Sequence, residues 1–339
     1  MDYKTINTII VDNNINFKNI LLKYDIVLFD FMGVVSDGNN TIKGSNEVLE
    51  FLKTNNKIVS FISNAPLLSS GMEKELIKYN IYKNKHYDFA LTSGEVSNKI
   101  MNSGLLKLDN EKELKNCYIF GKVSDENLLK NTQYNIVDNV ESADFIYIGY
   151  PQLNLKEYNL SNYKQYLYES CMFKDQYFDS TIIDVFIDKI KLFKKYNLPM
   201  FSDCSDKIAM QMDKNTKKIN YVIRQGSITD EYKKIGGKVI DISKPSSVIF
   251  DFVFNTIQMA YNINIKNKKI IMIGDTIETD ILGANNTTNN LNIKVDSMLT
   301  LSGVTAKYFN YNVSKIINNI INNKINLNYI IDSLGVILN

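Results

Sequence analysis

The chain has little of several residue types that mark particular kinds of protein. Among its 339 residues there are no tryptophans, one histidine, four prolines and a single arginine, Arg224, and the formal net charge is only +2. A nucleic-acid-binding surface, which needs clustered basic residues, is therefore not expected. The cysteines Cys117, Cys171 and Cys204 form no C-x-x-C pair, which argues against zinc and thioredoxin-like chemistry. We interpret them as buried free thiols in a reducing compartment.

Long apolar runs are also missing. No stretch approaches the roughly 20 apolar residues that a transmembrane helix requires. The first residues, MDYKTINTII, are acidic and polar where a signal peptide needs a basic start and an apolar run. We therefore expect a cytoplasmic protein with no membrane partner. With 45% apolar and 22% charged residues, the composition is that of a globular protein long enough for two domains.

Short apolar, β-branched runs alternate with segments of helical periodicity through most of the chain. We expect strands at Ile26–Asp30, Ile58–Ser63, Phe89–Thr92, Tyr118–Gly121, Phe145–Gly149, Lys238–Ile242 and Ile270–Gly274. Helical patterns between them include Asn46–Lys53, Met72–Tyr79 and Ser247–Tyr261. Near-continuous apolar strands are typical of parallel sheets buried on both faces. We therefore predict an α/β fold with a parallel, Rossmann-like sheet and right-handed crossovers.

The middle of the chain interrupts this alternation. Residues 103–238 are rich in Tyr, Lys and Asp and contain few clear strand–helix units. We interpret them as an inserted domain, with residues 1–102 and 239–339 forming the core domain. Near the C-terminus, Val313–Leu338 has Ile and Leu residues at helical intervals, which predicts a pair of helices covering the core. The same pattern also fits an interface of a homo-oligomer.

Polar side chains follow two strands in the first part of the chain. In open α/β sheets, ligands bind at the carboxyl ends of the strands. Asp30 ends the first strong strand and a glycine-containing turn follows, so its carboxylate can act as a nucleophile or can simply cap the turn. Ser63 and Asn64 end the second strand, where a hydroxyl and an amide can bind phosphoryl oxygens. Such a pair is also common in turns.

Two further motifs lie in the last third of the chain. Lys244, in the segment SKPSS before the helical pattern, can neutralise a phosphoryl group and a carboxylate nucleophile. The strand Ile270–Gly274 runs into GDTIETD, the most specific signal in the sequence. Asp275 suits Mg²⁺, a hard cation that takes oxygen ligands. Asp280 is placed to orient a metal-bound water or Lys244.

Taken in order, the motifs FDFMG, FISNAP, SKPSS and GDTIETD resemble the haloacid dehalogenase-like (HAD) superfamily. The resemblance is to the branch with a type-2 cap, which includes para-nitrophenylphosphatase-like and pyridoxal phosphatase-like enzymes, and it extends over nearly the whole chain. The segments LTSGE and GGKV also resemble that branch. The resemblance implies a Rossmann-like core with an inserted α/β cap.

The resemblance also implies a role for each motif. Asp30 would attack phosphorus and form an aspartyl-phosphate, Ser63 would bind the phosphoryl oxygens, and Lys244 would steady the charges. Asp30, Asp275 and the backbone carbonyl of Met32 would hold Mg²⁺. The substrate would be a small phosphorylated metabolite selected by the cap.

One position departs from the usual pattern of active members, which is D-x-D with the second aspartate as general acid and base. This chain reads Asp30-Phe31-Met32, and a thioether cannot move a proton. In this respect it resembles a subgroup with a bulky apolar residue at that position. General acid–base catalysis contributes about 10²–10⁴-fold, so we expect slow turnover of poor leaving groups. Asp37 is a candidate replacement acid, unless it only orders the loop.

Three functions follow from these residues. The first is a Mg²⁺-dependent phosphatase, and the second is a catalytically silent protein that keeps the phosphate and Mg²⁺ pocket as a sensor or interaction module. The third is phosphotransfer from Asp30 to an acceptor other than water. A dehalogenase is disfavoured, because that chemistry does not need the carboxylate of Asp275. His86, in a polar connection, is expected at the surface or in a turn without a catalytic role.

Overall fold

The computed structural model of the protein describes residues 8–11, 13–103, 114–121, 128–129, 132–151, 172–173, 181–212 and 219–338. The chain forms two compact units. The core unit comprises Met1–Ser63, Ser69–Thr92 and Lys244–Asn339, and the inserted unit comprises Asn64–Leu68 and Ser93–Ser243. Cys117 and Cys204 are buried free thiols, as predicted, whereas Cys171 lies outside the described residues. None of the helices in these ranges is long and apolar enough to cross a bilayer.

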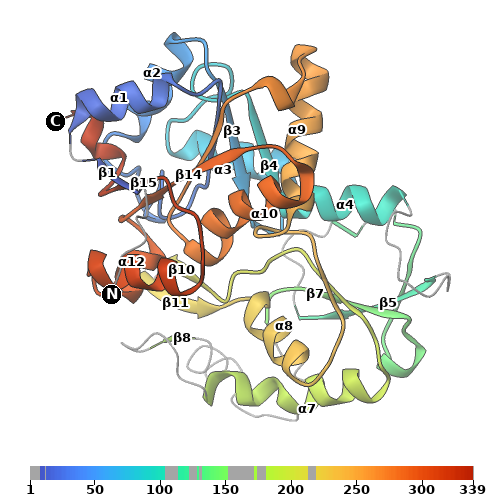
Figure 1. The fold of residues 1–339 in the computed structure, drawn as a ribbon. Coiled ribbons are helices and arrows are strands. Elements are labelled where there is room, and N and C mark those ends of the chain that lie inside the picture. The colour runs from blue at the N-terminus through green and yellow to red at the C-terminus, as the bar shows by residue number, and fades with distance from the viewer. Residues whose placement is uncertain are drawn as a thin grey trace. The chain divides into compact units, whose positions relative to one another are not determined.

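The core unit contains a seven-stranded sheet whose neighbouring strands are all parallel. In spatial order its strands are β1 (Ile9–Val11), β15 (Tyr329–Ile331), β14 (Val295–Thr300), β13 (Ile270–Gly274), β2 (Ile26–Phe29), β3 (Ile58–Ser63) and β4 (Phe89–Thr92). The strands at the centre, β2 and β13, are buried along their whole length. Segments from both ends of the chain therefore share one sheet, seen as the blue and the orange to red strands in Figure 1.

The strand order reverses between β2 and β13. From β2 the chain continues outward through β3 and β4, and from β13 it continues in the opposite direction through β14 and β15. In open α/β sheets such a reversal separates the loops on the two sides, and ligands bind at the carboxyl ends of the strands there. The residues that follow β2 and β13 are Asp30 and Asp275, so the topology brings these two carboxylates to the switch point.

Helices of the core unit connect its strands. They are α1 (Asn14–Leu22), α2 (Ser45–Thr54), α3 (Ser69–Lys78), α9 (Ser247–Tyr261), α10 (Leu282–Leu291), α11 (Val304–Tyr308) and α12 (Val313–Asn322), with short turns η2 (Ile265–Asn267), η3 (Ile277–Ile281) and η4 (Leu334–Leu338). The helix α9 is capped by Ser246, whose hydroxyl accepts a hydrogen bond from the amide of Val248. Its buried side chains recur at the spacing of one helical face.

The inserted unit has a parallel sheet of its own. Its five strands, in spatial order, are β12 (Val239–Asp241), β9 (Met200–Ser202), β7 (Phe145–Ile148), β5 (Asn116–Phe120) and β6 (Asn135–Val137). A second, antiparallel sheet contains β10 (Ile208–Met212), β11 (Ile219–Ile223) and β8 (Met172–Phe173). The helices are α4 (Ser93–Ser103), α7 (Thr181–Lys195) and α8 (Gln225–Lys234), with the turn η1 (Val140–Ser142). Buried rings of Phe120, Phe186 and Phe193 pack together in its core.

The predicted fold class is confirmed: a Rossmann-like α/β core with parallel strands and a second α/β unit inserted in it. One sequence interpretation was wrong. The segment Val313–Leu338 is not a helix pair, because α12 is followed by the strand β15 and the short turn η4. Of the two alternatives for His86, the structure shows the turn and not the surface. Its side chain is buried, and its Nδ1 accepts a hydrogen bond of 2.8 Å from the amide of Tyr82.

Candidate active site

Asp30 is held at the carboxyl end of β2 by the sheet and by the turn that follows. Its amide donates to the carbonyl of Ile273 in β13 (2.9 Å). The turn closes where the amide of Gly33 donates to the carbonyl of Ser36 (2.7 Å). Gly33 has φ +84°, and a Cβ atom there would lie 2.4 Å from Oδ2 of Asp275. Only glycine fits both the left-handed backbone and the close carboxylate.

Lys244 connects two of the acidic side chains. Its Nζ lies 2.7 Å from Oδ1 of Asp30 and 2.7 Å from Oδ1 of Asp280. The lysine side chain is 1% exposed, so its hydrogen bonds are shielded from water. Burial opposes the ammonium form, but the carboxylates of Asp280 and Asp30 together raise the pKa of Lys244 above its ordinary value. The lysine therefore stays charged and holds the carboxylate of Asp30 in one place.

Asp280 is fixed by a tight turn after β13. It belongs to the π-helical turn η3, and its Oδ2 accepts from the amides of Asp275 and Thr276, both at 3.1 Å. Single π-turns of this kind are frequent at functional sites. Since its Oδ1 is bonded to Lys244, both oxygens of Asp280 are engaged by donors from the protein. Its position therefore serves the lysine and the backbone of the Asp275 turn.

Asp275 follows β13 and is more deeply buried than Asp30, which follows β2. The residue is 2% exposed, and its Oδ2 accepts from the amide of Val304 at 2.6 Å. A Cβ atom at Gly303 would lie 1.9 Å from the same oxygen, so glycine is required here too. Burial, and after it the charges of Asp280 and Asp30, raise the pKa of Asp275 well above its usual range.

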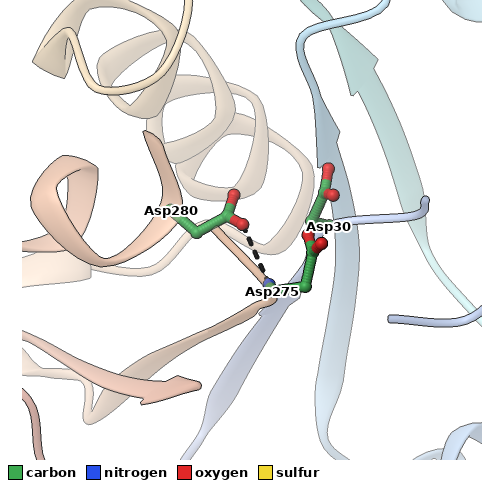
Figure 2. A group of neighbouring side chains, drawn as sticks. All are labelled: Asp30, Asp275 and Asp280. Carbon is green, nitrogen blue, oxygen red and sulfur yellow. Dashed lines mark hydrogen bonds between the residues drawn. The ribbon is translucent and has the colours of Figure 1, made fainter. Parts of the chain in front are cut away.

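Asp30, Asp275 and Asp280 form a compact acidic cluster (Figure 2). Each contributes one carboxylate oxygen to a group in which all ligand atoms lie within 4.8 Å of one another. Lys244 pairs with only two of these carboxylates, and the pKa of Asp275 is raised by its burial and then by the charges of the other two. A divalent cation with oxygen ligands offsets these charges, and Mg²⁺ is commonly bound by one or two carboxylates. The side chains present therefore fit Mg²⁺, with Asp30 and Asp275 as the carboxylate ligands.

The other predicted site residues, Ser63 and Asn64, follow one another in the chain but belong to different units. Ser63 is the last residue of β3, the strand beside β2, and is 8% exposed. Asn64 already belongs to the inserted unit, where its Nδ2 donates to Oδ1 of Asp206 (2.9 Å) and to Oγ of Ser205 (3.3 Å). The structure thus brings Asp30, Lys244, Asp275 and Asp280 together directly, and it gives the amide of Asn64 partners of its own.

The position of the usual second aspartate is occupied by Met32, in the turn after Asp30. Met32 forms an isolated bridge with Ser36 in this turn and is partly exposed. Asp37 uses its Oδ1 to accept from the amides of Asn39 (2.8 Å) and Asn40 (2.7 Å). Such bonds are those of an Asx turn. The geometry of Asp37 therefore matches the loop-ordering interpretation.

Sequence reasoning missed the segment after β14. The hydroxyl of Ser302 donates to the carbonyl of Gly33 (2.6 Å), and the hydroxyl of Thr305 accepts from the amide of Ile277 (3.2 Å). With the amide of Val304 on Asp275, this segment supports both turns of the acidic cluster. A signal was present, because Ser302-Gly303 follows directly on the apolar strand end at Thr300-Leu301.

Comparison with known proteins agrees with this architecture. Residues 27–135 match a family model described as haloacid dehalogenase-like hydrolase, and residues 241–334 match a second described as HAD-hydrolase-like. The matches include the strands that carry Asp30 and Asp275. No curated protein sequence matches the chain significantly.

Solved structures share the fold at low sequence identity. A possible sugar phosphatase of the HAD superfamily from Cytophaga hutchinsonii has a TM-score of 0.66 and 18% identity over 97% of this chain and 99% of that one. A 4-nitrophenylphosphatase from Thermotoga maritima has a TM-score of 0.56 and 19% identity, covering 93% and 97%. A glycerol phosphate phosphatase from Mycobacterium tuberculosis, in complex with calcium, has 0.52 and 15%, covering 84% and 68%.

The fold and the acidic site define a Rossmann-like hydrolase core with an inserted α/β unit. With the two family matches at its core strands, the chain belongs to the haloacid dehalogenase-like hydrolase superfamily.

Proposed function

We propose that the protein is a Mg²⁺-dependent phosphatase that acts on a small phosphomonoester through an aspartyl-phosphate on Asp30. The observation that carries this proposal is the hydrogen-bonded chain from Asp30 through Lys244 to Asp280 beside the buried Asp275. The names of the structural relatives, a possible sugar phosphatase, a 4-nitrophenylphosphatase and a glycerol phosphate phosphatase, support the same class of reaction.

The nucleophile is a carboxylate oxygen of Asp30, which attacks phosphorus as the ester P–O bond breaks. The electron pair of that bond leaves with the alcohol or phenol oxygen. Water then attacks the phosphorus of the aspartyl-phosphate and gives up a proton to the solvent. The bond between phosphorus and the Asp30 oxygen breaks, which regenerates the carboxylate and releases inorganic phosphate. Lys244 keeps Asp30 oriented and offsets the added negative charge. Mg²⁺, held by Asp30, Asp275 and the backbone carbonyl of Met32, would shield the anionic nucleophile from the anionic substrate.

Met32 limits which substrates react quickly. A methionine donates no proton to a leaving oxygen, so an alcohol of high pKa has to leave without help from this position. A missing general acid costs about 10²–10⁴-fold in rate. Phosphate esters of acidic phenols lose less, because their leaving group is already stable as an anion.

The inserted unit is proposed as the cap that selects the substrate, since residues of a lid or cap commonly exclude water and choose the ligand. The cap predicted from the sequence, residues 103–238, lies within this unit. The substrate is proposed to be a small phosphorylated metabolite, and a cytoplasmic location remains part of the same proposal.

The test is turnover of para-nitrophenyl phosphate with Mg²⁺, beside an Asp30→Asn variant. Its activated leaving group bypasses the missing acid, so the assay probes the nucleophile and the metal. We expect turnover that disappears in Asp30→Asn, and phosphate bound covalently to the wild type after rapid acid quench. Equal rates in both proteins would contradict the proposal.

A second candidate is a catalytically silent protein that binds phosphate and Mg²⁺. The observation that favours it is Met32 in place of an acid. It predicts that inorganic phosphate and Mg²⁺ bind in a calorimeter although para-nitrophenyl phosphate is not consumed.

A further inference from the structure

The chain passes between the two units directly beside two of the proposed phosphate-binding groups. Ser63 is the last core residue before Asn64, and Lys244 is the first core residue after Ser243. A peptide bond joins each pair, so the position of Asn64 restricts Ser63 and the position of Ser243 restricts Lys244. The contacts that hold Asn64 and Ser243 in the inserted unit therefore bear on the site.

Both crossing residues are bonded to one dipeptide, Ser205-Asp206, in the loop after β9. Nδ2 of Asn64 donates to Oδ1 of Asp206 at 2.9 Å and to Oγ of Ser205 at 3.3 Å. The amide of Ser205 donates to Oγ of Ser243 at 2.8 Å. We call these four residues the clasp: Asn64, Ser205, Asp206 and Ser243. It connects two crossings that lie far apart in the sequence.

The clasp is anchored on both sides by buried groups. Ser243 donates from its amide (3.0 Å) and its hydroxyl (2.6 Å) to Oδ1 of Asp241 at the end of β12. At the other side the amide of Gly226 donates to the carbonyl of Asp206 (3.0 Å). A Cβ atom at Gly226 would lie 2.0 Å from the carbonyl oxygen of Ser205, so the start of α8 packs closely on the dipeptide.

The segment that begins at Asn64 has a second attachment within the inserted unit. The carbonyl of Ala65 accepts from the hydroxyl of Ser93 and from the amide of Gly94, both at 3.2 Å. Ser93 is itself the first inserted-unit residue after β4. Three crossings of the chain are thus fixed by short polar contacts, and Asp206 provides the charged acceptor among them.

We propose that Asp206 is a positioning residue for the reaction: through Asn64, and with Ser205 through Ser243, it sets the positions of Ser63 and Lys244. This inference rests on the proposed phosphatase function. Asp206 needs no contact with the substrate for this role. Since a misplacement of about 1 Å can cost about 100-fold in rate, loosening the two crossings should lower kcat more than it raises KM.

The variants separate positioning from folding. Asp206→Ala removes the acceptor for Asn64, whereas Asp206→Asn keeps an oxygen that can accept the same bond. Ser243→Ala breaks the other half of the clasp. Asp230→Ala is the matched control, because it removes a partly exposed aspartate of the same unit that pairs with the surface lysines Lys207 (2.8 Å) and Lys233 (3.8 Å).

The measurements are kcat and KM for para-nitrophenyl phosphate with Mg²⁺, the inhibition constant of inorganic phosphate, and the melting temperature of each protein. We expect kcat to fall about 10- to 100-fold in Asp206→Ala and in Ser243→Ala. Asp206→Asn and Asp230→Ala should stay within about twofold of the wild type, and phosphate should inhibit Asp206→Ala more weakly.

Unchanged kcat in both Asp206→Ala and Ser243→Ala, or equal losses in Asp206→Ala and Asp206→Asn, overturn the positioning role. A wild type with no turnover above Asp30→Asn overturns the phosphatase function instead. The clasp is then judged by the affinity for inorganic phosphate in a calorimeter. Weaker binding in Asp206→Ala than in Asp206→Asn supports it, and equal binding overturns it.

Discussion

Both parallel sheets carry buried or half-buried carboxylates at the carboxyl ends of their strands, but the groups that bind these carboxylates differ. In the core unit, Asp30 and Asp280 are bonded to the ammonium group of Lys244. In the inserted unit, Asp203 follows β9 and accepts from the hydroxyl of Tyr147, while Asp241 accepts from Ser243. Hydroxyl donors leave the buried charge uncompensated, and a lysine compensates it.

The carboxylates that lack an ammonium partner have raised pKa values in both units. In the core unit this is Asp275. In the inserted unit, burial raises the pKa of Asp203 to about 7, with Asp241 adding to the effect, and burial raises the pKa of Asp241 to about 6. Near pH 7, Asp203 is therefore about half protonated and Asp241 is mostly ionised. The core cluster differs because it keeps a charged lysine against Asp30 and Asp280, which suits a nucleophile at Asp30. Position at a strand end is therefore not enough for chemistry, because the partner decides the charge.

The largest expected effect on stability and turnover comes from removing the lysine of the core cluster, so that its carboxylates lack an ammonium partner as those of the inserted unit do. Lys244→Met leaves Asp30 and Asp280 buried without their cation. Removing one partner of a buried pair costs about 3–5 kcal/mol, so we expect that loss in the free energy of unfolding at pH 7, together with loss of turnover. Urea denaturation measures it.

The control for this change is Lys207→Met, which breaks the exposed pair with Asp230 (2.8 Å, lysine 48% exposed). Exposed pairs contribute about 0–1 kcal/mol. Equal destabilisation by the two substitutions would show that the charge of Lys244 is not what distinguishes the core cluster.

The next test places a general acid at position 32, where the new carboxylate can donate a proton to the leaving oxygen. Met32→Asp should raise kcat for alkyl phosphates of poor leaving ability by about 10²–10⁴-fold. Turnover of para-nitrophenyl phosphate should change far less, since its leaving group needs little protonation. A gain that is the same for both kinds of ester would contradict the role assigned to position 32.

Some of this organisation could be predicted from the sequence and some could not. Asp30, Ser63, Lys244 and Asp275 stand at strand ends or next to a proline, and such local patterns are visible without the structure. The clasp could not be predicted, because Asn64 and Asp206 are 142 positions apart in the sequence and meet only in the folded protein. No local pattern encodes such a contact.

Burial of polar side chains was the other gap. His86 was expected at the surface or in a turn because its neighbours in the sequence are polar. It does lie in a turn, but its side chain is buried, with Nδ1 bonded to the amide of Tyr82 and Nε2 3.3 Å from Glu50. The strand β15 has only three residues, too few to show an alternating or continuous apolar pattern, and the helical spacing around it dominated the interpretation.

Asp203 in the inserted unit is expected to have a smaller effect on the free energy of unfolding, and this effect depends on pH. The pKa of Asp203 is higher in the folded protein, about 7, than in the unfolded chain, so the folded state binds the proton more tightly. Its contribution is therefore fully present below the unfolded pKa and is lost as the pH rises towards about 7. Asp203→Asn should remove this slope and raise stability at pH 8 by an amount on the order of 2 kcal/mol relative to the wild type.

Thermal denaturation of both proteins between pH 4 and pH 8 measures the difference. Asp230→Asn serves as the control, because it removes a partly exposed aspartate of the same unit that pairs with Lys207. If the Asp203→Asn difference is flat over this range, Asp203 is ionised throughout, and the contrast between the two clusters is wrong.

The smallest expected effect on turnover is at Asp37, a carboxylate that belongs to neither group of carboxylates and binds the backbone of its own turn. Its Oδ1 accepts from the amides of Asn39 and Asn40, and an asparagine offers an oxygen in the same place. Asp37→Asn should therefore leave kcat within about twofold for para-nitrophenyl phosphate and for alkyl phosphates alike, whereas Asp37→Ala loosens the turn and lowers both. A loss confined to alkyl phosphates in Asp37→Asn would instead make Asp37 the proton donor, because only those esters need their leaving oxygen protonated.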